Sequence, residues 1–433
     1  MDRTLLKKAA IQSVALMLAV ITLSYAFHQY RLVTISAKDS VNSEELLTSD
    51  QDSGSSKTDL HTSKDGKPSD IINVDSNTDN ASITELLSSI DPKIKNQLGE
   101  KYLIIKKPKG TDISIHLDDL YVNKSIRVEL TGLSDASIND SFVGRVNKDQ
   151  IFYDEPEFKE IITPNTDKSS NSNEPVITKD YGNDIVHGIS VTTQLDDATK
   201  LYTADLMIEL DSVYAQIVYN DSAYYFIALK KPKEVYDKVL VIDAGHGGKD
   251  GGALSQGHQY CEKNINLDIL LKLKELLDKE NIKVYYTRTE DTTVFLRPRV
   301  TLANEVDCDF FISIHSNASD ASWPNGTEVL YYDKSSKGVK NKDLGQIFLG
   351  GLDKLIPLRN RGLVQEHNDA VFILDKATVP AILIEVGYVT NNNDMNYLKE
   401  PENQETIAQG IYNGIMQAYK KYPELIGKQE ETK

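Results

Sequence analysis

VLVIDAGHGGKDGGA, residues 239–253, runs a series of branched apolar residues directly into a histidine surrounded by glycines. The apolar run predicts a buried strand. His246 stands just after the end of this strand, where open α/β sheets place their reactive groups. We expect the glycines to clear bulk for an approaching substrate and to permit positive φ in the loop. The loop matches neither GxGxxG nor GxxxxGK[ST], so it does not predict a phosphate-binding site.

Strands and amphipathic helices alternate in the sequence that surrounds this stretch. This alternation predicts an α/β domain over residues 236–424, with a mostly parallel sheet and helices on both faces. A polar tail, residues 425–433, follows it. The apolar runs predict strands at 238–245, 282–288, 309–318, 326–332, 370–374 and 381–391, and helices at 264–281, 297–307, 341–355 and 404–422.

The sequence before residue 236 has a different pattern of apolar and polar residues. Short alternating or β-branched runs separated by Asp, Asn, Gly and Ser predict a β-rich module over residues 95–232, with a sandwich as one arrangement. A loop or insertion is predicted at residues 163–178. Residues 36–89 are rich in Ser, Asp and Asn, and they predict a disordered linker because they cannot bury enough apolar surface to offset the entropy of ordering.

The N-terminus combines a basic lead, residues 1–8, with an apolar run from Ala9 to Phe27. The run is long enough to span a bilayer as a helix. The basic lead predicts that the N-terminus stays in the cytoplasm and that the bulk of the chain lies outside. Two alternatives remain: a single-pass transmembrane anchor at the cell membrane, or a signal peptide that is cleaved after Ala26 and leaves a secreted protein.

Charge and cysteine content exclude some classes of protein. The 433 residues carry a formal net charge of -17, which argues against nucleic acid as a partner because a phosphate backbone needs a basic footprint. The two cysteines are too few for a disulfide framework or a thiolate zinc cluster. Any bound metal is therefore expected to be held by histidine and carboxylate.

Polar side chains at the ends of predicted strands form a candidate metal site. His246 and His315 each follow an apolar strand, and Glu262 stands at the start of the next helix. Two imidazoles and one carboxylate are a common ligand set for catalytic zinc. Taken alone, Glu262 has the alternative role of a first-turn carboxylate that interacts with the helix dipole. No HExxH helix accompanies the set, so a thermolysin-type site is not predicted.

Glu385 ends a strand whose neighbours predict burial, and an ionised carboxylate there needs a cation or a donor. Beside a metal it would serve as a general base toward an attacking water. The alternative is an ion pair with Arg288, Arg297 or Arg361. We assign a weaker role, orienting the ligands or contacting the substrate, to Asp243, Asn266, Asn317 and Arg361.

Five stretches, in order, carry a resemblance to a known family: VIDAGHGGKDGGA, EKNINL, VYYTRTEDTTVFLRPR, ANEVDCDFFISIHSNA and PAILIEVGYVTNN. Together they resemble the zinc-dependent N-acetylmuramoyl-L-alanine amidases of the Amidase_3 family, over roughly residues 238 to 421. The resemblance implies Zn²⁺ held by His246, Glu262 and His315, with Glu385 as the catalytic acid/base. It also implies hydrolysis of the amide between N-acetylmuramic acid and L-alanine in peptidoglycan by a zinc-activated water, in cell-wall remodelling or lysis.

Two other functions fit the same residues. One is a zinc peptidase that acts within the peptide stem, and the other is a non-catalytic wall-binding regulator built on an amidase fold. The β-rich module is loosely similar to wall-targeting AMIN-type modules. The expected partners are peptidoglycan as substrate and the membrane through residues 9–27, and we expect a monomer.

Overall fold

The computed structural model describes residues 47–48, 86–136, 138, 142–163, 176–367 and 369–427. The predicted membrane segment, nearly all of the predicted linker and most of the polar tail lie outside these residues. In the part of the chain that the structure describes, no helix has both the length and the apolar character that a bilayer crossing requires. Both cysteines, Cys261 and Cys308, are free.

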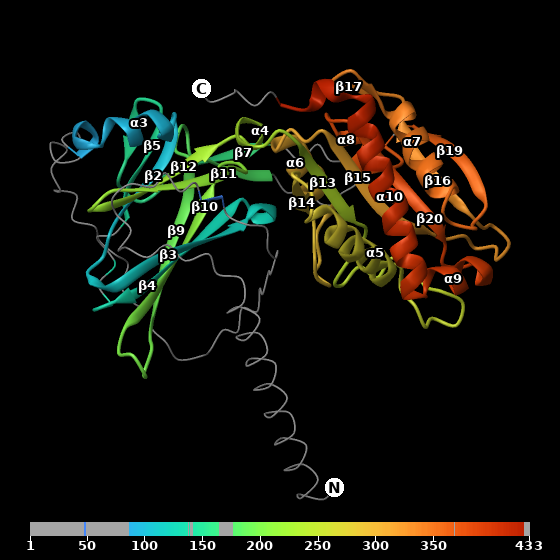
Figure 1. The fold of residues 1–433 in the computed structure, drawn as a ribbon, viewed down its shortest axis with the longest axis horizontal. Helices are drawn as coiled ribbons and strands as arrows, with labels where there is room; N and C mark the ends of the chain where they lie inside the picture. Colours follow the sequence, from blue (N-terminus) through green and yellow to red (C-terminus); the bar gives the residue numbers. More distant parts are fainter. Residues whose placement is uncertain are drawn as a thin grey trace, which may run out of the picture.

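Two bodies lie side by side along the long axis of the molecule (Figure 1). We call residues 86–231, together with the strand at residues 47–48 that pairs with them, the β-rich domain, and residues 236–427 the α/β domain. The short helix α4 (Pro232–Val235) connects them.

Two antiparallel sheets build the β-rich domain. The first has six strands in the order β1 (Leu47–Thr48), β11 (Ala215–Asn220), β12 (Tyr224–Lys230), β2 (Lys101–Lys106), β5 (Phe142–Asn147) and β6 (Gln150–Phe152). The second has four strands in the order β3 (Gly110–Leu120), β4 (Ser125–Leu133), β10 (Tyr202–Leu210) and β9 (Val186–Leu195). The turn η2 (Tyr121–Asn123) joins β3 to β4.

Alternation of apolar and polar residues explains how the two sheets pack. Leu103 and Ile227 from the first sheet share a buried cluster with Val128 and Leu206 from the second. The two sheets therefore enclose a core between them, as in the sandwich arrangement.

The other face of the six-stranded sheet is covered by α3 (Pro92–Leu98), whose Leu98 is buried against Ile104 and Phe226. The sequence analysis did not predict this helix. Its start was readable, because Asp91 caps the first turn and Pro92 occupies the first helical position.

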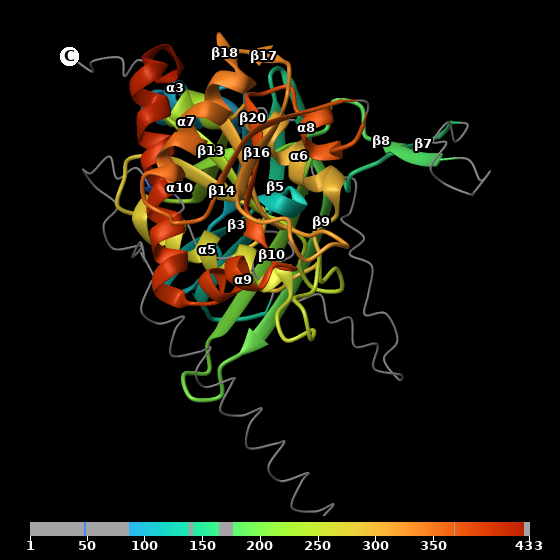
Figure 2. The same cartoon turned by 90° about the vertical axis from the view of Figure 1, so that its right-hand side faces the viewer.

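A two-stranded hairpin projects from the β-rich domain (Figure 2). It consists of β7 (Lys159–Thr163) and β8 (Val176–Asp180). These strands occupy both ends of the segment that the sequence predicts as a loop or insertion.

A mixed six-stranded sheet forms the centre of the α/β domain. Its order is β14 (Lys283–Tyr286), β13 (Val239–Ala244), β15 (Phe310–Asn317), β20 (Ala381–Tyr388), β16 (Thr327–Tyr332) and β19 (Asn360–Glu366). Four of the five pairings are parallel, and the β16–β20 pairing is antiparallel. The reversal follows from the short connection after β15, because a parallel return needs a crossover of a dozen residues or more.

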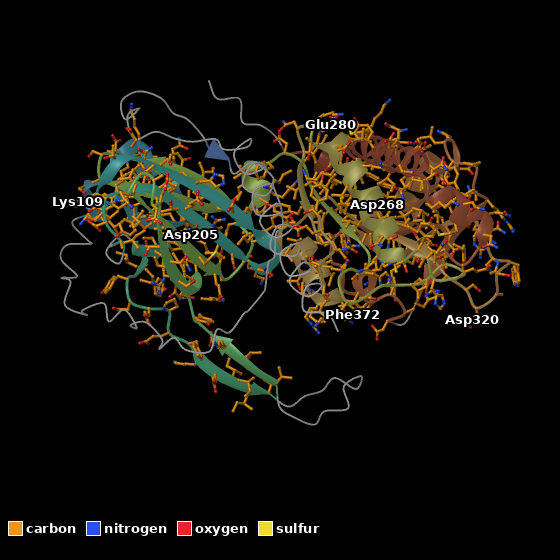
Figure 3. All side chains as sticks on the ribbon, turned by 90° about the horizontal axis from the view of Figure 1, so that it is seen from below. Lys109, Asp205, Asp268, Glu280, Asp320 and Phe372 are labelled. Carbon is orange, nitrogen blue, oxygen red and sulfur yellow. The ribbon has the colours of Figure 1, made fainter. Side chains whose placement is uncertain are left out.

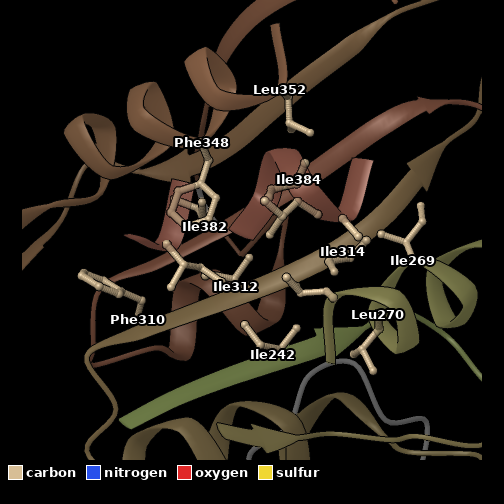
Figure 4. Close-up of a cluster of buried hydrophobic side chains, with 14 of the residues drawn as sticks. Ile242, Ile269, Leu270, Phe310, Ile312, Ile314, Phe348, Leu352, Ile382 and Ile384 are labelled. Atoms are coloured by element: carbon tan, nitrogen blue, oxygen red, sulfur yellow. The ribbon is translucent and has the colours of Figure 1, made fainter. Parts of the chain in front are cut away.

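Helices cover both faces of this sheet. One face packs against α5 (Glu262–Leu277), α7 (Asn341–Asp353) and α10 (Pro401–Lys421). Figure 4 shows part of this core, with Ile242, Ile312 and Ile382 of neighbouring strands beside Phe348 of α7. The opposite face packs against α6 (Leu296–Glu305) and α8 (Phe372–Lys376). The smaller elements are β17 (Ser335–Ser336), β18 (Val339–Lys340), α9 (Asn392–Leu398) and η3 (Pro423–Leu425).

The predicted strand at residues 370–374 is wrong, because this apolar run forms most of α8. A short apolar run cannot be assigned to strand or helix by periodicity. Here the run forms a helix, and its Ile373 and Leu374 are buried against one face of the sheet. The strand that completes the sheet is β19, whose polar sequence NRGLVQE was not predicted to be a strand.

Candidate metal centre and active site

Two strand ends and one helix start bring the three predicted ligands to one place. His246 follows the last residue of β13 by two positions, and β15 carries His315 near its carboxyl end. Glu262 is the first residue of α5. Because β13 and β15 are parallel neighbours, their carboxyl ends meet at the same edge of the sheet.

One ligand atom from each of these side chains lies within 4.8 Å of the other two. Glu262 stands between the imidazoles, with Oε2 3.2 Å from His246 Nε2 and Oε1 3.0 Å from His315 Nδ1. Zinc bonds of about 2.0–2.1 Å in a tetrahedral arrangement separate neighbouring donor atoms by roughly 3.3 Å. The three donor types are those of catalytic zinc sites, and their ligand atoms lie near enough to one another to hold one ion.

His246 adopts an uncommon backbone conformation and is held from several sides. Its φ of 61° lies in the left-handed region, which is uncommon outside glycine. Its carbonyl accepts a hydrogen bond from Arg299 Nη2 at 2.7 Å. Its Nδ1 lies 2.9 Å from Asp250 Oδ2, so Nε2 is the nitrogen that faces Glu262.

The glycines of this loop make room for the side chains of the site itself. A Cβ on Gly245 would lie 2.2 Å from the His315 ring, and a Cβ on Gly252 would lie 2.7 Å from Glu262 Oε2. The positive φ predicted for this loop is present at Gly247, Gly248 and Gly252. Three side chains from separate elements converge here, and a β-carbon at Gly245 or Gly252 would overlap them.

Glu262 is buried and densely hydrogen-bonded. Its carboxylate accepts from the backbone N–H groups of Ala253 and Ser316, at 3.0 and 3.1 Å, and from Asn266 Nδ2 at 3.2 Å. Asn266 is oriented in turn by the Ser316 hydroxyl, which donates to its Oδ1 at 2.9 Å. Burial opposes ionisation, but the hydrogen bonds and charges of the two imidazoles outweigh it and hold the pKa of Glu262 well below its ordinary value.

Asp243 acts on the site through the backbone of the loop. Its carboxylate is buried and accepts from the hydroxyls of Thr287 (2.5 Å) and Ser313 (2.6 Å) and from Arg299 Nη1 (2.5 Å). Burial opposes its ionisation, but Arg299 lies close enough that the pKa of Asp243 falls below its ordinary value. Asp243 therefore fixes the arginine that holds the carbonyl of His246.

Glu385 lies in β20 between two strands of the site. It is the register partner of His315 in the parallel pair and of Glu328 in the antiparallel pair, so these three residues project from the same face. It is half-buried, and its Oε2 is excluded from solvent without a hydrogen-bond partner. Burial raises the pKa of Glu385 well above its ordinary value, and the carboxylates of Glu262 and Glu328 raise it further.

Asn317 and Arg361 donate hydrogen bonds to Glu328 rather than to the predicted metal ligands. Arg361 Nε donates to Glu328 Oε2 at 2.6 Å, and Asn317 Nδ2 donates to Oε1 at 2.7 Å. The Tyr388 hydroxyl also donates to Oε1, at 3.1 Å. Arg361 therefore pairs with Glu328, which is the neighbour of Glu385.

Several residues around the site were missed by the sequence analysis. Asp250 had a readable signal, a carboxylate four residues after His246 in a polar loop. Glu328 is a single carboxylate in a predicted apolar strand, and this pattern does not indicate which residues it will contact. Arg299 is buried and binds backbone carbonyls, which no local pattern indicates. Arg288, named above as a possible ion-pair partner of Glu385, is also buried and binds backbone carbonyls. Arg288 donates to the carbonyls of Ala244, Gly245 and Lys263, at 2.8–2.9 Å.

Comparison with known proteins identifies the family of the α/β domain. The model of the Amidase_3 family, described as N-acetylmuramoyl-L-alanine amidase, matches residues 240–417. LytC of Bacillus subtilis (strain 168), named an N-acetylmuramoyl-L-alanine amidase, is 33% identical over 192 residues, which are 44% of this chain. The match spans only 37% of the length of LytC.

Two further relatives match over most of their own length. The uncharacterized protein YqiI of Bacillus subtilis (strain 168) is 32% identical over 182 residues, covering 42% of this chain and 85% of YqiI. The solved catalytic domain of CwlV, an N-acetylmuramoyl-L-alanine amidase from Bacillus (Paenibacillus) polymyxa var. colistinus, is 34% identical. It covers 42% of this chain and 98% of its own, with a TM-score of 0.40. Through residues 240–417, the chain belongs to the Amidase_3 family of N-acetylmuramoyl-L-alanine amidases.

Proposed function

We propose that this protein is a zinc-dependent hydrolase that cleaves the amide bond between N-acetylmuramic acid and L-alanine in peptidoglycan. The observation that carries the proposal is the convergence of His246, Glu262 and His315 within 4.8 Å, beside Glu385. Family membership supports the substrate class.

Zinc is the metal that we propose for this site. Two imidazole nitrogens and one carboxylate oxygen leave one coordination position for a water or a substrate atom, as in catalytic rather than structural zinc sites. When bound, zinc acts as a Lewis acid toward the scissile carbonyl and lowers the pKa of a water molecule.

Glu385 is the residue that we propose to move the proton. Its carboxylate takes the proton of the attacking water and returns it to the amine of L-alanine as the C–N bond breaks. A general acid/base works best when its pKa lies near the working pH. Burial and two neighbouring carboxylates raise the pKa of Glu385, which favours the protonated form that gives a proton to the amine.

The surrounding residues keep the three ligands in place. Asp250 holds the His246 ring, and Asn266 with the N–H of Ser316 holds the Glu262 carboxylate. Such partners orient ligands and raise metal affinity. Glu328 lies opposite Glu385 in the sheet and is itself fixed by Arg361.

Digestion of purified peptidoglycan by the zinc-loaded full chain tests the proposal. The amidase reaction releases complete stem peptides with a free L-alanine amine and leaves muramic acid without a peptide, which mass analysis detects directly. Treatment with a chelator should stop release, and added zinc should restore it. Shortened stems on intact muramic acid would identify a stem peptidase instead, and no product from a zinc-loaded protein would identify a non-catalytic wall-binding protein.

We further propose that the chain is exported and held at the cell membrane by residues 9–27, with both domains outside facing the cell wall. The proposal rests on the mostly apolar run, free of charged residues, that follows a basic lead. Fractionation of cells that make the full chain tests it. An anchored protein stays with the membrane at its full mass, whereas a cleaved signal peptide leaves a shorter protein in the medium.

A further inference from the structure

The β-rich domain closes the free edge of the central sheet of the α/β domain. β14 is an edge strand, and the backbone groups of Tyr286 point away from β13. The Tyr121 hydroxyl accepts a hydrogen bond from Tyr286 N and donates one to Tyr286 O, both at 3.0 Å. One phenol therefore satisfies both groups of an edge residue that otherwise lack a neighbouring strand.

Three further contacts fix the same boundary, which is seen from below in Figure 3. The Tyr121 ring meets the Tyr285 ring edge-on, with centroids 4.9 Å apart. Lys283 Nζ of β14 lies 3.7 Å from Asp119 Oδ2, and both side chains are buried. Val213 of the β-rich domain is buried in the hydrophobic cluster that includes residues of α6.

Helix α6 is held by the β-rich domain through its last residue. Lys124 Nζ lies 2.5 Å from Glu305 Oε1, and the Ser212 hydroxyl donates to Glu305 Oε2 at 3.3 Å. The β-rich domain thus contacts two elements of the α/β domain, β14 and α6.

The side chains that support the loop of His246 lie on α6 and in the two residues that follow β14. Thr287 directly follows the residue that Tyr121 binds, and its hydroxyl donates to Asp243. Arg288 is next in the chain and holds the carbonyls of residues 244 and 245. Arg299 of α6 holds the carbonyls of residues 244 and 246. The residue that Tyr121 binds is therefore next in the chain to Thr287, which supports the loop. On the other side, α6 carries both Glu305 at the domain boundary and Arg299 at the loop.

We propose that Tyr121 is a positioning residue for the metal centre: by closing the edge of β14, it holds Thr287 and Arg288 so that they fix the loop of His246. The β-rich domain is then a structural part of the site, beyond any role in binding the cell wall. The part of this inference that concerns turnover rests on the proposed function, whereas the part that concerns the loop and its metal does not.

Tyr121→Phe in the full chain tests the inference, because it removes the hydroxyl and keeps the ring. The matched control is Tyr225→Phe, a buried tyrosine of the same domain whose hydroxyl has no hydrogen-bond partner. A second variant, Glu305→Gln, weakens the contact with α6 and leaves Tyr121 in place. Circular dichroism and thermal unfolding establish that each variant is folded.

Amide hydrogen exchange of the metal-free protein is the first measurement. Loss of both hydrogen bonds leaves a buried N–H and C=O unpaired, so exchange in peptides covering 283–288 and 243–248 should rise roughly tenfold in Tyr121→Phe. Glu305→Gln should raise exchange in 243–248 to a smaller extent, and Tyr225→Phe should match the wild type. Faster exchange confined to 283–288 would overturn the inference, because the hydroxyl would then only cap the strand.

Zinc affinity, measured by competition with a chromogenic chelator, is the second measurement. Tyr121→Phe should bind zinc several-fold more weakly than the wild type and Tyr225→Phe, and peptide release should fall in parallel. Unchanged zinc affinity would overturn the inference. A wild-type protein that binds zinc but releases no peptide would overturn the proposed function and leave the exchange and affinity results valid.

Discussion

His246 Nδ1 lies 2.9 Å from Asp250 Oδ2, and this contact turns the opposite nitrogen of the ring toward Glu262. Asp250 belongs to the same loop as His246, and its Oδ1 also accepts from Gly252 N at 3.1 Å. One carboxylate therefore sets both the ring orientation and the shape of the loop.

Asp250→Asn is expected to weaken zinc binding by about 10- to 100-fold, the usual cost of removing a partner that orients a metal ligand. Chelator competition on the purified chain measures it. Asp320→Asn, an exposed aspartate in the loop after β15, makes the same change of charge and should bind zinc like the wild type. Equal affinities of the two variants would contradict a role for Asp250.

Gly245→Ala is expected to disrupt the site, because the added methyl group would stand 2.2 Å from the His315 ring. Overpacking of this kind typically destabilises the folded protein by about 1–3 kcal/mol. Here the strain would displace His315, a predicted metal ligand. We expect zinc affinity to drop at least tenfold. Gly251→Ala is the control, since a methyl group there meets nothing within 4 Å. Normal zinc binding by Gly245→Ala would show that His315 is free to move aside.

Glu385→Gln should retain zinc and lose peptide release by roughly 10²- to 10⁴-fold, the range that general acid/base groups contribute. The amide has a similar shape but cannot accept the proton. Metal content by mass spectrometry and peptide release from peptidoglycan measure the two effects separately. Turnover near the wild-type rate would assign proton transfer to another group.

The β-rich domain should show a pH-dependent stability from His116. The hydrogen bond that His116 Nε2 donates to Asp118 Oδ1, at 3.0 Å, raises the pKa of His116, and burial opposes this shift in part. Because the folded pKa lies above the unfolded value of about 6.5, the stabilisation is fully present below that pH. It is lost as the pH rises through the folded pKa.

The comparison of wild type with His116→Gln measures this contribution. The difference in the free energy of unfolding should be largest below about pH 6.5 and should shrink toward pH 8. In an Asp118→Asn background the same change should lose most of its pH dependence. A difference that grows with pH would contradict the assignment.

Asp184→Ala should destabilise the β-rich domain strongly. Asp184 and Arg145 form a buried ion pair, and Arg145 Nε donates to Asp184 Oδ1 at 2.7 Å. Removing one partner leaves the other charge buried and unpaired, which costs about 3–5 kcal/mol. Urea unfolding followed by circular dichroism measures the loss. Asp197→Ala removes a carboxylate from an exposed pair with Lys200 and should leave the unfolding curve unchanged.

The sequence by itself determined the class of the α/β domain and the types of residue at its site. Apolar runs that end in His246 and His315 predict buried strands, and buried strands separated by helices predict a layered sheet whose strand ends meet. The motifs also indicated the family, and the comparisons confirm it. These features are readable because burial and helix periodicity are properties of local sequence.

Only the tertiary structure decided how these parts combine. The antiparallel pairing of β16 places Glu328 opposite Glu385, and no local pattern states which strand will be a neighbour. The contact of Tyr121 with Tyr286 joins residues 165 positions apart. The room that Gly245 leaves for His315 likewise exists only once β13 and β15 lie side by side. Such relationships depend on packing between distant segments, because register, strand direction and domain contact are set by the whole core.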